Sequence, residues 1–408
     1  MKKMRPFVMM GATIGLAACT LSPVATTGGD GRILIKSEGA VETKDVPIQL
    51  APDNGASASY RQAQATPTFG YGITYVARVP AVTVGSGLVM ASDIKVDGNT
   101  AYIAYNTQGE RFAGAVQILD ISNRLQPRIT REIQFTDLKV NKLFLDGKTL
   151  LFGGGANPDR YSFRSYVGKI ALDNLDAGQI ANSLRGLRSY ATTGIAKHGN
   201  RYYVGVGARD GGLSVLDTDL KETAFLAYPD VRDLDKYESG VVAVAGMTDN
   251  ANPTGKVLMV GENDKTSEIP IQNFRSDYAK STVQANVHQA FLGLSQLGFQ
   301  VVDLKSNATV FTLPNPTSDP NHVTNSVACD GNLVFVANGE YGFRVLTLGD
   351  TKATGAGFAT LVGYHSLMGE AYDGKRYSAN DLRYANGYLF VASGVGGVNV
   401  YKVEPNSK

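Results

Sequence analysis

A unit of about 47 residues recurs seven times along this chain, and this repetition constrains the fold more than any other feature. Each copy has an apolar strand, a turn with Gly or Asn, a second apolar strand and a third strand that ends in a short aliphatic run. The third strands end near residues 120, 173, 217, 260, 303, 347 and 402. Such a spacing holds four strands of about 5–6 residues with short turns between them.

Seven such sheets favour a closed ring, because an open stack leaves end sheets and strand edges exposed. The last copy stops after three strands, near Val403. A strand-like segment at 73–79 precedes the first copy and is the expected fourth strand of the last sheet. We therefore predict an all-β fold over residues 73–404. It is a seven-bladed β-propeller of four-stranded antiparallel blades, with the ring closed by this N-terminal strand.

The first 18 residues predict a lipoprotein signal peptide. Lys2, Lys3 and Arg5 precede an apolar stretch at 6–18, which is shorter than the roughly 20 residues of a membrane-spanning helix. The sequence LAAC, ending at Cys19, resembles the lipobox of bacterial lipoproteins. This resemblance implies cleavage before Cys19 and attachment of palmitate-type acyl chains to that residue. Several acyl chains give durable membrane anchoring.

Residues 19–72 are expected to hold the lipidated cysteine, a flexible tether and a short N-terminal segment. The stretch 20–31 is rich in Ser, Thr, Gly and Pro, as flexible linkers are, and 32–50 contains strand-like patches. Thr20 stands where many lipoproteins of the inner membrane carry Asp. The resemblance thus implies anchoring in the bacterial outer membrane, facing the periplasm or the cell surface.

Composition argues against several other classes of protein. The chain has 39 Lys and Arg against 37 Asp and Glu, so no basic surface for nucleic acid is expected. Two cysteines and four histidines leave little material for a metal centre, and we predict neither a metal nor a cofactor. Cys329 lies in an apolar run and is expected to pack as a small hydrophobic residue.

The third strands of three copies end in an aliphatic pair followed by Asp, as in ILD at 118–120, VLD at 215–217 and VVD at 301–303. With the glycines before these strands, the pattern resembles the repeat of LVIVD proteins, which are bacterial and archaeal surface propellers. The resemblance covers about residues 73–403 and implies a fold and a surface location, with no established activity. Three copies depart from it, with Val260, Thr347 and Lys402 at the Asp position. The chain contains no Trp, in contrast to WD40 and quinoprotein-type repeats.

In a propeller the first strand of each blade lines the central channel. Aligning the copies on their turns predicts one column of Lys95, Phe144, Ala196, Ala328 and Arg383, with Asp235 and His288 nearby. A second column holds Asp93, Lys142, Gly194, Ser326 and Asp381. Mixed charges also face water in a propeller without a ligand, so two interpretations stay open. As a binding site, Lys95 and Arg383 would hold an acidic or sugar ligand.

The longest copies add loop residues to the first, second and seventh units, which are neighbours in a closed ring. Aromatic residues in these loops, Tyr161 and Tyr372 among them, suit contact with a protein or a glycan. Packing against blade edges explains them equally well. On the first interpretation, binding centres on this sector of the ring.

These patterns predict a membrane-anchored envelope lipoprotein that acts as a binding or scaffold module for a protein or carbohydrate partner. The alternative is a propeller enzyme, lactonase-like or lyase-like, that uses residues at the channel mouth. Such enzymes usually gather several histidines and carboxylates, or calcium, at one mouth. The scarcity of histidine favours the binding module, and no catalytic residues are assigned.

Overall fold

The computed structural model describes residues 26–27, 31–48, 70–123, 125–246, 254–274, 280–367, 371–372 and 374–406. The signal peptide and the predicted lipidation site at Cys19 lie outside these residues. Among the helices in the described part, none combines the length and apolar composition that crossing a membrane requires.

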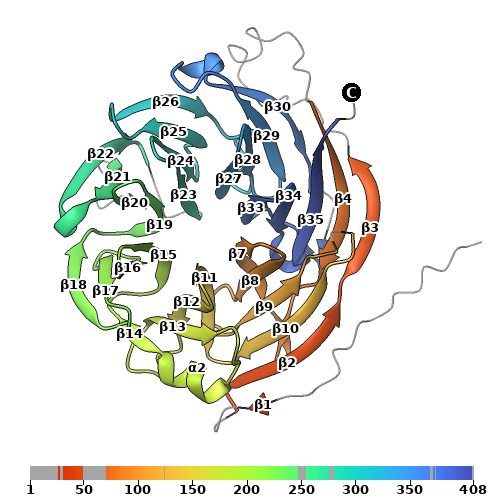
Figure 1. The fold of residues 1–408 in the computed structure, drawn as a ribbon, viewed down its shortest axis with the longest axis vertical. Helices are drawn as coiled ribbons and strands as arrows, with labels where there is room; N and C mark the ends of the chain where they lie inside the picture. The colour runs from red at the N-terminus through yellow and green to blue at the C-terminus, as the bar shows by residue number, and fades with distance from the viewer. Residues whose placement is uncertain are drawn as a thin grey trace, which may run out of the picture.

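Seven antiparallel sheets form a ring around a central channel, which confirms the predicted fold class (Figure 1). The first blade comprises β7 (Met90–Asp97), β8 (Thr100–Asn106), β9 (Gly114–Asp120) and β10 (Arg128–Phe135). The second comprises β11 (Leu138–Asp146), β12 (Thr149–Ala156), β13 (Ser165–Ala171) and β14 (Arg185–Leu187). The third comprises β15 (Thr192–His198), β16 (Arg201–Val206), β17 (Gly212–Leu216) and β18 (Glu222–Ala227). The fourth comprises β19 (Val231–Tyr237), β20 (Gly240–Ala245), β21 (Thr254–Val260) and β22 (Thr266–Gln272).

The remaining blades follow the same order from the channel outward. The fifth comprises β23 (Ser281–Ala285), β24 (Gln289–Leu294), β25 (Phe299–Asp303) and β26 (Ala308–Leu313). The sixth comprises β27 (Ser326–Asp330), β28 (Leu333–Ala337), β29 (Phe343–Leu348) and β30 (Ala359–His365). The seventh comprises β33 (Asp381–Ala385), β34 (Tyr388–Ala392), β35 (Val398–Pro405) and β4 (Tyr71–Val79).

Short elements complete the described chain. They are α2 (Ala177–Ser183), the 3₁₀ turns η1 (Glu262–Asp264), η2 (Gly355–Gly357) and η3 (Gly394–Gly396), and the strand pairs β5 (Thr83–Val84) with β6 (Gly87–Leu88) and β31 (Ala371–Tyr372) with β32 (Lys375–Arg376). Asp176 caps α2, because its carboxylate accepts a hydrogen bond from the backbone N–H of Gln179.

The hydrophobic core lies between neighbouring blades. Phe291 and Phe299 of the fifth blade, for example, belong to one buried cluster with Val334 and Leu346 of the sixth. Middle strands carry apolar residues on both faces, because each blade is covered by a neighbour on either side; all five residues of β28 are buried. Packing between blades therefore holds the ring together.

The seventh blade takes its outer strand from the N-terminal side of the chain. β4 pairs antiparallel with β35, from Val79 opposite Val398 to Tyr71 opposite Pro405. The two ends of the propeller sequence thus share one sheet.

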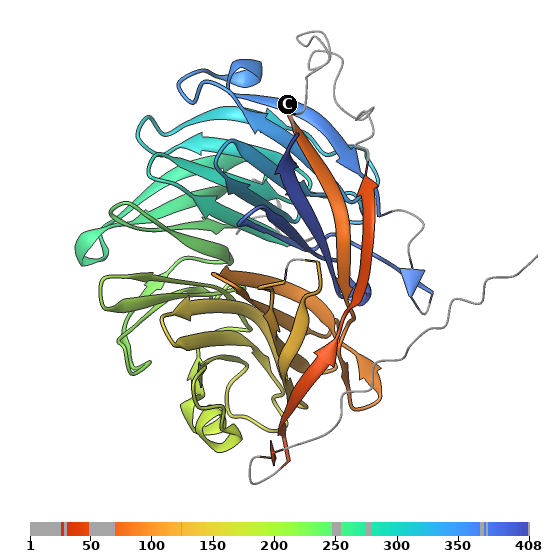
Figure 2. The same ribbon diagram turned by 45° about the vertical axis from the view of Figure 1, so that its right-hand side comes forward.

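Two more strands lie outside this junction. β2 (Ile33–Ala40) pairs with β10 of the first blade, and β3 (Glu42–Ile48) pairs with β4 of the seventh. Only Val41 separates β2 from β3, so one short segment crosses the outer edge where the first and last blades meet (Figure 2). A further short strand, β1 (Thr26–Thr27), pairs with β2. The strand-like patches expected in 32–50 are these two edge strands, and we call residues 33–48 the staple.

Candidate functional site

One position on the inner strand of every blade forms a layer across the channel. This charged layer consists of Asp93, Lys142, Gly194, Asp233, Thr282, Ser326 and Asp381, taken from the strand registers of the seven blades. It contains every residue of the second predicted column. Equivalent residues of repeated units occupy equivalent places in a closed ring, so the sequence alignment located this layer correctly.

Ion pairs join the layer across the channel. The ammonium of Lys142 lies 2.9 Å from Asp233 and 3.7 Å from Asp93. The ammonium of Lys280, which comes from just before β23, lies 2.9 Å from Asp381. Lys142 and the three carboxylates are all buried. The layer therefore places paired charges across the channel, and Lys142 lines the cavities on both sides of it.

The pKa values of Lys142 and Asp381 reflect this pairing, whereas at Asp233 burial outweighs it and raises the pKa. Burial disfavours the charge on Lys142, but the carboxylates of Asp233, Asp93 and Asp381 outweigh burial and raise its pKa. Burial likewise opposes ionisation of Asp381, but Lys280, Lys142 and Lys95 lower its pKa to about 2. At neutral pH, Lys142 is thus protonated and Asp381 is ionised.

Several of these carboxylates also connect neighbouring blades. Asp93 accepts a hydrogen bond from the backbone N–H of Leu143 at 2.8 Å, and Asp233 accepts one from Val283 at 3.2 Å. Both bonds run from one blade to the inner strand of the next. The layer therefore links neighbouring blades in addition to presenting polar groups to the channel.

On one side of the layer, a narrow cavity of about 330 Å³ brings most of the first predicted column together. Lys95, Phe144, Asp235 and Arg383 line it. Asp235 accepts backbone hydrogen bonds from Lys236 and Ala285, and burial raises its pKa despite these bonds. Asp235 thus has a structural role beside any role in binding.

Two polar atoms of the narrow cavity are buried without a hydrogen-bond partner in the protein. They are Nε of Arg383 and Oγ1 of Thr282. A buried polar group without a partner destabilises a fold by about 1–3 kcal/mol unless a ligand or water satisfies it. Both residues line the cavity, so these two unpartnered atoms lie in or directly behind its wall.

His288 does not line the narrow cavity, although it was expected near the first predicted column. It is exposed in the turn between β23 and β24. Gln284 holds the equivalent position, and its side-chain amide bonds to the backbone of Cys329 in the next blade. The turn is built by Asn286, whose side-chain oxygen accepts from the backbone N–H of His288 and Gln289. This turn therefore lacks the glycine that marks most other hairpins. Without that glycine, the sequence alignment assigned His288 to the wrong position.

Tyr161 lies at the opposite end of the blades from Lys95 and Arg383, so the predicted sector is not one site. Tyr161 follows β12, near the start of the inner strands, where its hydroxyl lies 3.3 Å from Asp137. The guanidinium of Arg32 lies 5.3 Å from the centre of its ring. Tyr161 thus packs against the chain entering the staple. Tyr372 belongs to β31, and its side chain lies outside what the structure describes.

On the other side of the charged layer, a wider cavity of about 970 Å³ opens between the loops. Seven polar residues line it, one from each blade and each directly before the layer position: Ser92, Asn141, Thr193, Arg232, Ser281, Asn325 and Asn380. We call them the polar ring. The sequence reasoning missed it, although its members stand one residue before the second predicted column.

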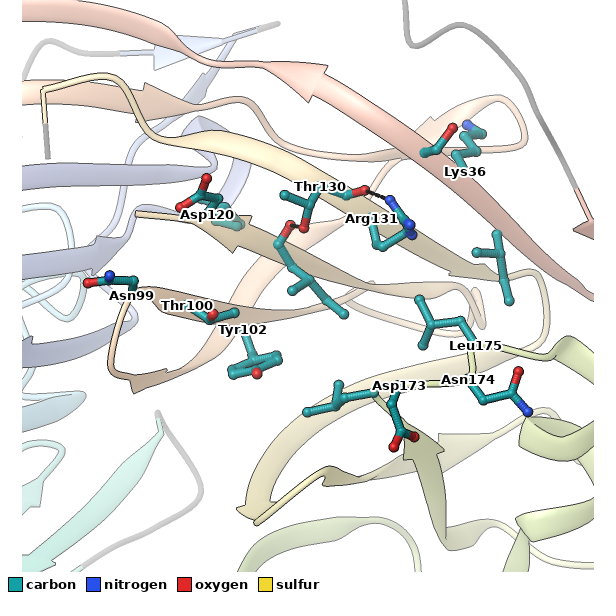
Figure 3. A pocket seen from close by; sticks show the side chains of 15 residues that line it. Lys36, Asn99, Thr100, Tyr102, Asp120, Thr130, Arg131, Asp173, Asn174 and Leu175 are labelled. Carbon is teal, nitrogen blue, oxygen red and sulfur yellow. Dashed lines mark hydrogen bonds between the residues drawn. The ribbon is translucent and has the colours of Figure 1, made fainter. Parts of the chain in front are cut away.

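A third cavity, of about 670 Å³, lies between the first two blades and beneath the staple (Figure 3). Lys36 of β2 lines it, as do Tyr102 and Asp173, which lie in the lower part of the view. The carboxylate of Asp120 already accepts hydrogen bonds from Ser122 and Arg128, which lower its pKa to about 2. The staple creates this cavity by extending the edge of the first blade.

Comparisons with known proteins agree with the fold. No family model matches the chain, and no curated protein matches it. Among solved structures, the WD40 repeats of RRP9 align with a TM-score of 0.56 at 11% identity, covering 84% of this chain and 99% of that one. A chain of the Mitotic Checkpoint Complex aligns with a TM-score of 0.51 at 12% identity, covering 81% and 100%. At these identities the likeness concerns the fold alone, which this chain builds without a single Trp.

Proposed function

We propose that this chain is a lipid-anchored binding module of the bacterial envelope, whose propeller captures a protein or glycan partner through its channel. The lipobox-like sequence at Cys19 supports the anchor, and the LVIVD-like repeat endings support a surface location. A propeller presents a rigid ring of loops and a lined channel, which suits recognition.

The observation that carries the proposal is the narrow cavity at Lys95 and Arg383. These two cations come from the first and seventh blades and line one enclosed space. Lys95 is paired with Asp93 at 3.3 Å, whereas Nε of Arg383 is buried without a partner. An acidic or hydroxyl-bearing group of a partner would supply a hydrogen-bond partner for Arg383. Because charge-assisted hydrogen bonds are the stronger ones, Arg383 supplies the main contact.

The anchor is tested by Cys19→Ser with metabolic palmitate labelling. We expect the variant to incorporate no palmitate and to remain soluble or uncleaved. Unchanged membrane retention of Cys19→Ser would contradict the lipoprotein assignment.

Capture is tested by affinity pull-down from membranes with the lipidated protein as bait. We expect a partner retained by the wild type and lost with Arg383→Ala. A partner retained equally by both proteins would contradict the role of the narrow cavity.

A further inference from the structure

The wide cavity does not end at the channel. It meets a side pocket of about 820 Å³, and Thr107 and Asn141 line both spaces. The side pocket extends over the loops of the first two blades as far as Tyr190. We call these two adjacent spaces the groove; the charged layer lies between it and the narrow cavity.

We propose that this groove binds an acidic oligosaccharide. The inference rests on the proposed binding function and specifies a ligand class for it, at a site distinct from Lys95 and Arg383. Four features of the lining support it.

The first feature is the chemistry of the polar ring. Six of its seven members are Ser, Thr or Asn, whose hydroxyl and amide groups both donate and accept hydrogen bonds. Sugar hydroxyls do the same, so each can form paired contacts with such a ring. The larger apolar side chains that line the wide cavity are Met90, Val323 and Val395.

The second feature is a gap in the bonding of the ring. Four members donate to a backbone carbonyl of the next blade: Ser92 to Val140, Asn141 to Thr192, Thr193 to Val231 and Asn325 to Ala379. Ser281 breaks this pattern. Ser281 is 1% exposed and lines the wide cavity, and its Oγ has no hydrogen-bond partner in the protein. A ligand hydroxyl or carboxylate supplies the missing partner.

The third feature is charge. Among the described residues, seven cationic side chains line the groove against three anionic ones: Lys142, Arg232, Lys280, Arg376, Arg111, Lys139 and Arg164 against Glu340, Glu110 and Asp159. Lys142 and Lys280 pair with carboxylates of the charged layer, Arg232 pairs with Asp230, and Arg376 pairs with Glu340. The excess of positive charge therefore lies in the side pocket, where Arg111, Lys139 and Arg164 lie with Glu110 and Asp159. This excess favours sugar residues that carry carboxylates.

The side pocket adds a flat surface for a sugar ring. Tyr190 lines the side pocket and is 57% exposed. Phe112 also lines it, and the ammonium of Lys139 lies 4.8 Å from the centre of the Phe112 ring.

The test is calorimetric titration of the full-length lipidated protein in detergent. The probes are tetragalacturonate, which carries one carboxylate per sugar, maltotetraose as the neutral chain, and tetraglutamate as the acidic peptide. We expect tetragalacturonate to bind at least tenfold more tightly than either control, with an affinity that falls as salt rises. No binding of tetragalacturonate or of other uronic-acid oligosaccharides overturns the proposal, as does equal or tighter binding of tetraglutamate.

Paired variants locate the site. Ser281→Ala should weaken binding of tetragalacturonate about tenfold and leave the melting temperature unchanged or higher, because its hydroxyl has no partner to lose. Thr282→Val removes the neighbouring unpartnered hydroxyl, which faces the narrow cavity, and should leave this binding intact. Arg164→Ala should weaken binding, whereas Arg160→Ala, in the same loop but outside the lining, should not. Equal effects within either pair overturn the site.

The outcomes separate this inference from the broader function. Partner capture that depends on Arg383, without any oligosaccharide binding, rejects the groove alone. Tetragalacturonate binding without membrane anchoring or partner capture supports the groove and rejects the envelope-scaffold proposal.

Discussion

The ammonium of Lys142 and the carboxylate of Asp233 lie 2.9 Å apart, although their strands belong to the second and fourth blades. The third blade lies between them, and its residue in the charged layer is Gly194. A Cβ at position 194 would lie 2.7 Å from the backbone nitrogen of Leu234 and 3.0 Å from Oδ1 of Asp233. Because Gly194 has no side chain, the inner strands of the third and fourth blades can approach closely, and Lys142 can reach Asp233 past the third blade.

Gly194→Ala should therefore destabilise the propeller by about 1–3 kcal/mol, because the new methyl group forces the inner strands apart. Chemical denaturation measures this change. Gly70→Ala is the matched control, since a Cβ there meets nothing within 4 Å, and its effect should stay within about 0.5 kcal/mol. Equal stability of the two variants would show that the close approach does not matter.

Asp381→Asn should lower stability at neutral pH, on the order of 1–3 kcal/mol. Burial opposes the charge of Asp381, but Lys280, Lys142 and Lys95 outweigh it and lower its pKa to about 2 in the folded protein. A depressed carboxyl pKa stabilises the fold above its ordinary value of 3.8, and this contribution disappears as the pH falls from about 4 to 2. The difference between wild type and variant should thus shrink over that interval in denaturation series. A difference that grows toward low pH would contradict the pairing.

Removing the staple should loosen the ring without dissolving its blades. The side chains of Ile33 and Ile35 are buried in the core of the first two blades, so Ile33→Ala with Ile35→Ala should cost about 3–6 kcal/mol of unfolding free energy. Leu34→Ala, on the other face of β2, should cost less than about 1 kcal/mol. Deleting 20–60 should leave four-stranded blades that melt earlier, whereas deletion through Val79 also removes β4 and should abolish cooperative melting. Identical melting of the two truncations would exclude β4 as the closing strand.

Lys95→Ala combined with Arg383→Ala should weaken partner capture by about 1–3 kcal/mol if these residues are hot spots. Lys256→Ala is the control, because Lys256 pairs with Glu268 on the outer strands of the fourth blade, far from the channel. Tyr161 lies at the other end of the blades, so Tyr161→Ala should lower the stability of the fold and leave the affinity for the partner unchanged. Surface plasmon resonance with the captured partner separates these effects. A loss with Lys256→Ala equal to that of the channel pair would reject the narrow cavity.

The thiol of Cys329 should react at least tenfold more slowly with iodoacetamide in the folded protein than after unfolding. Burial raises its pKa to about 12, and the nearby carboxylate of Asp235 adds to the shift, so little thiolate exists at pH 8. Mass spectrometry of the alkylated peptide follows the reaction. Fast alkylation in the native state would show that the sixth blade opens readily.

Two features could not be predicted from the sequence: the pairing of the staple, and the turn between β23 and β24 of the fifth blade. Strand-like patches near Ile33 and Ile35 were visible, but their partners were not, because pairing depends on which sheet edges stand next to each other after closure. In the turn between β23 and β24, the side chain of Asn286 accepts the hydrogen bonds that build the turn, and no glycine marks it. The position of His288 was therefore assigned wrongly.

The sequence alone determined the seven repeats, the all-β class and the layer that holds Asp93, Lys142 and Asp381. These follow from local periodicity, since equivalent residues of a repeat meet equivalent surroundings around a ring. Only the tertiary structure decided which loops share a face, how Lys142 reaches Asp233 past Gly194, and which buried atoms, such as Oγ of Ser281, lack a partner. Those features depend on distances of a few ångströms between segments far apart in the chain, and no pattern within one repeat encodes such distances.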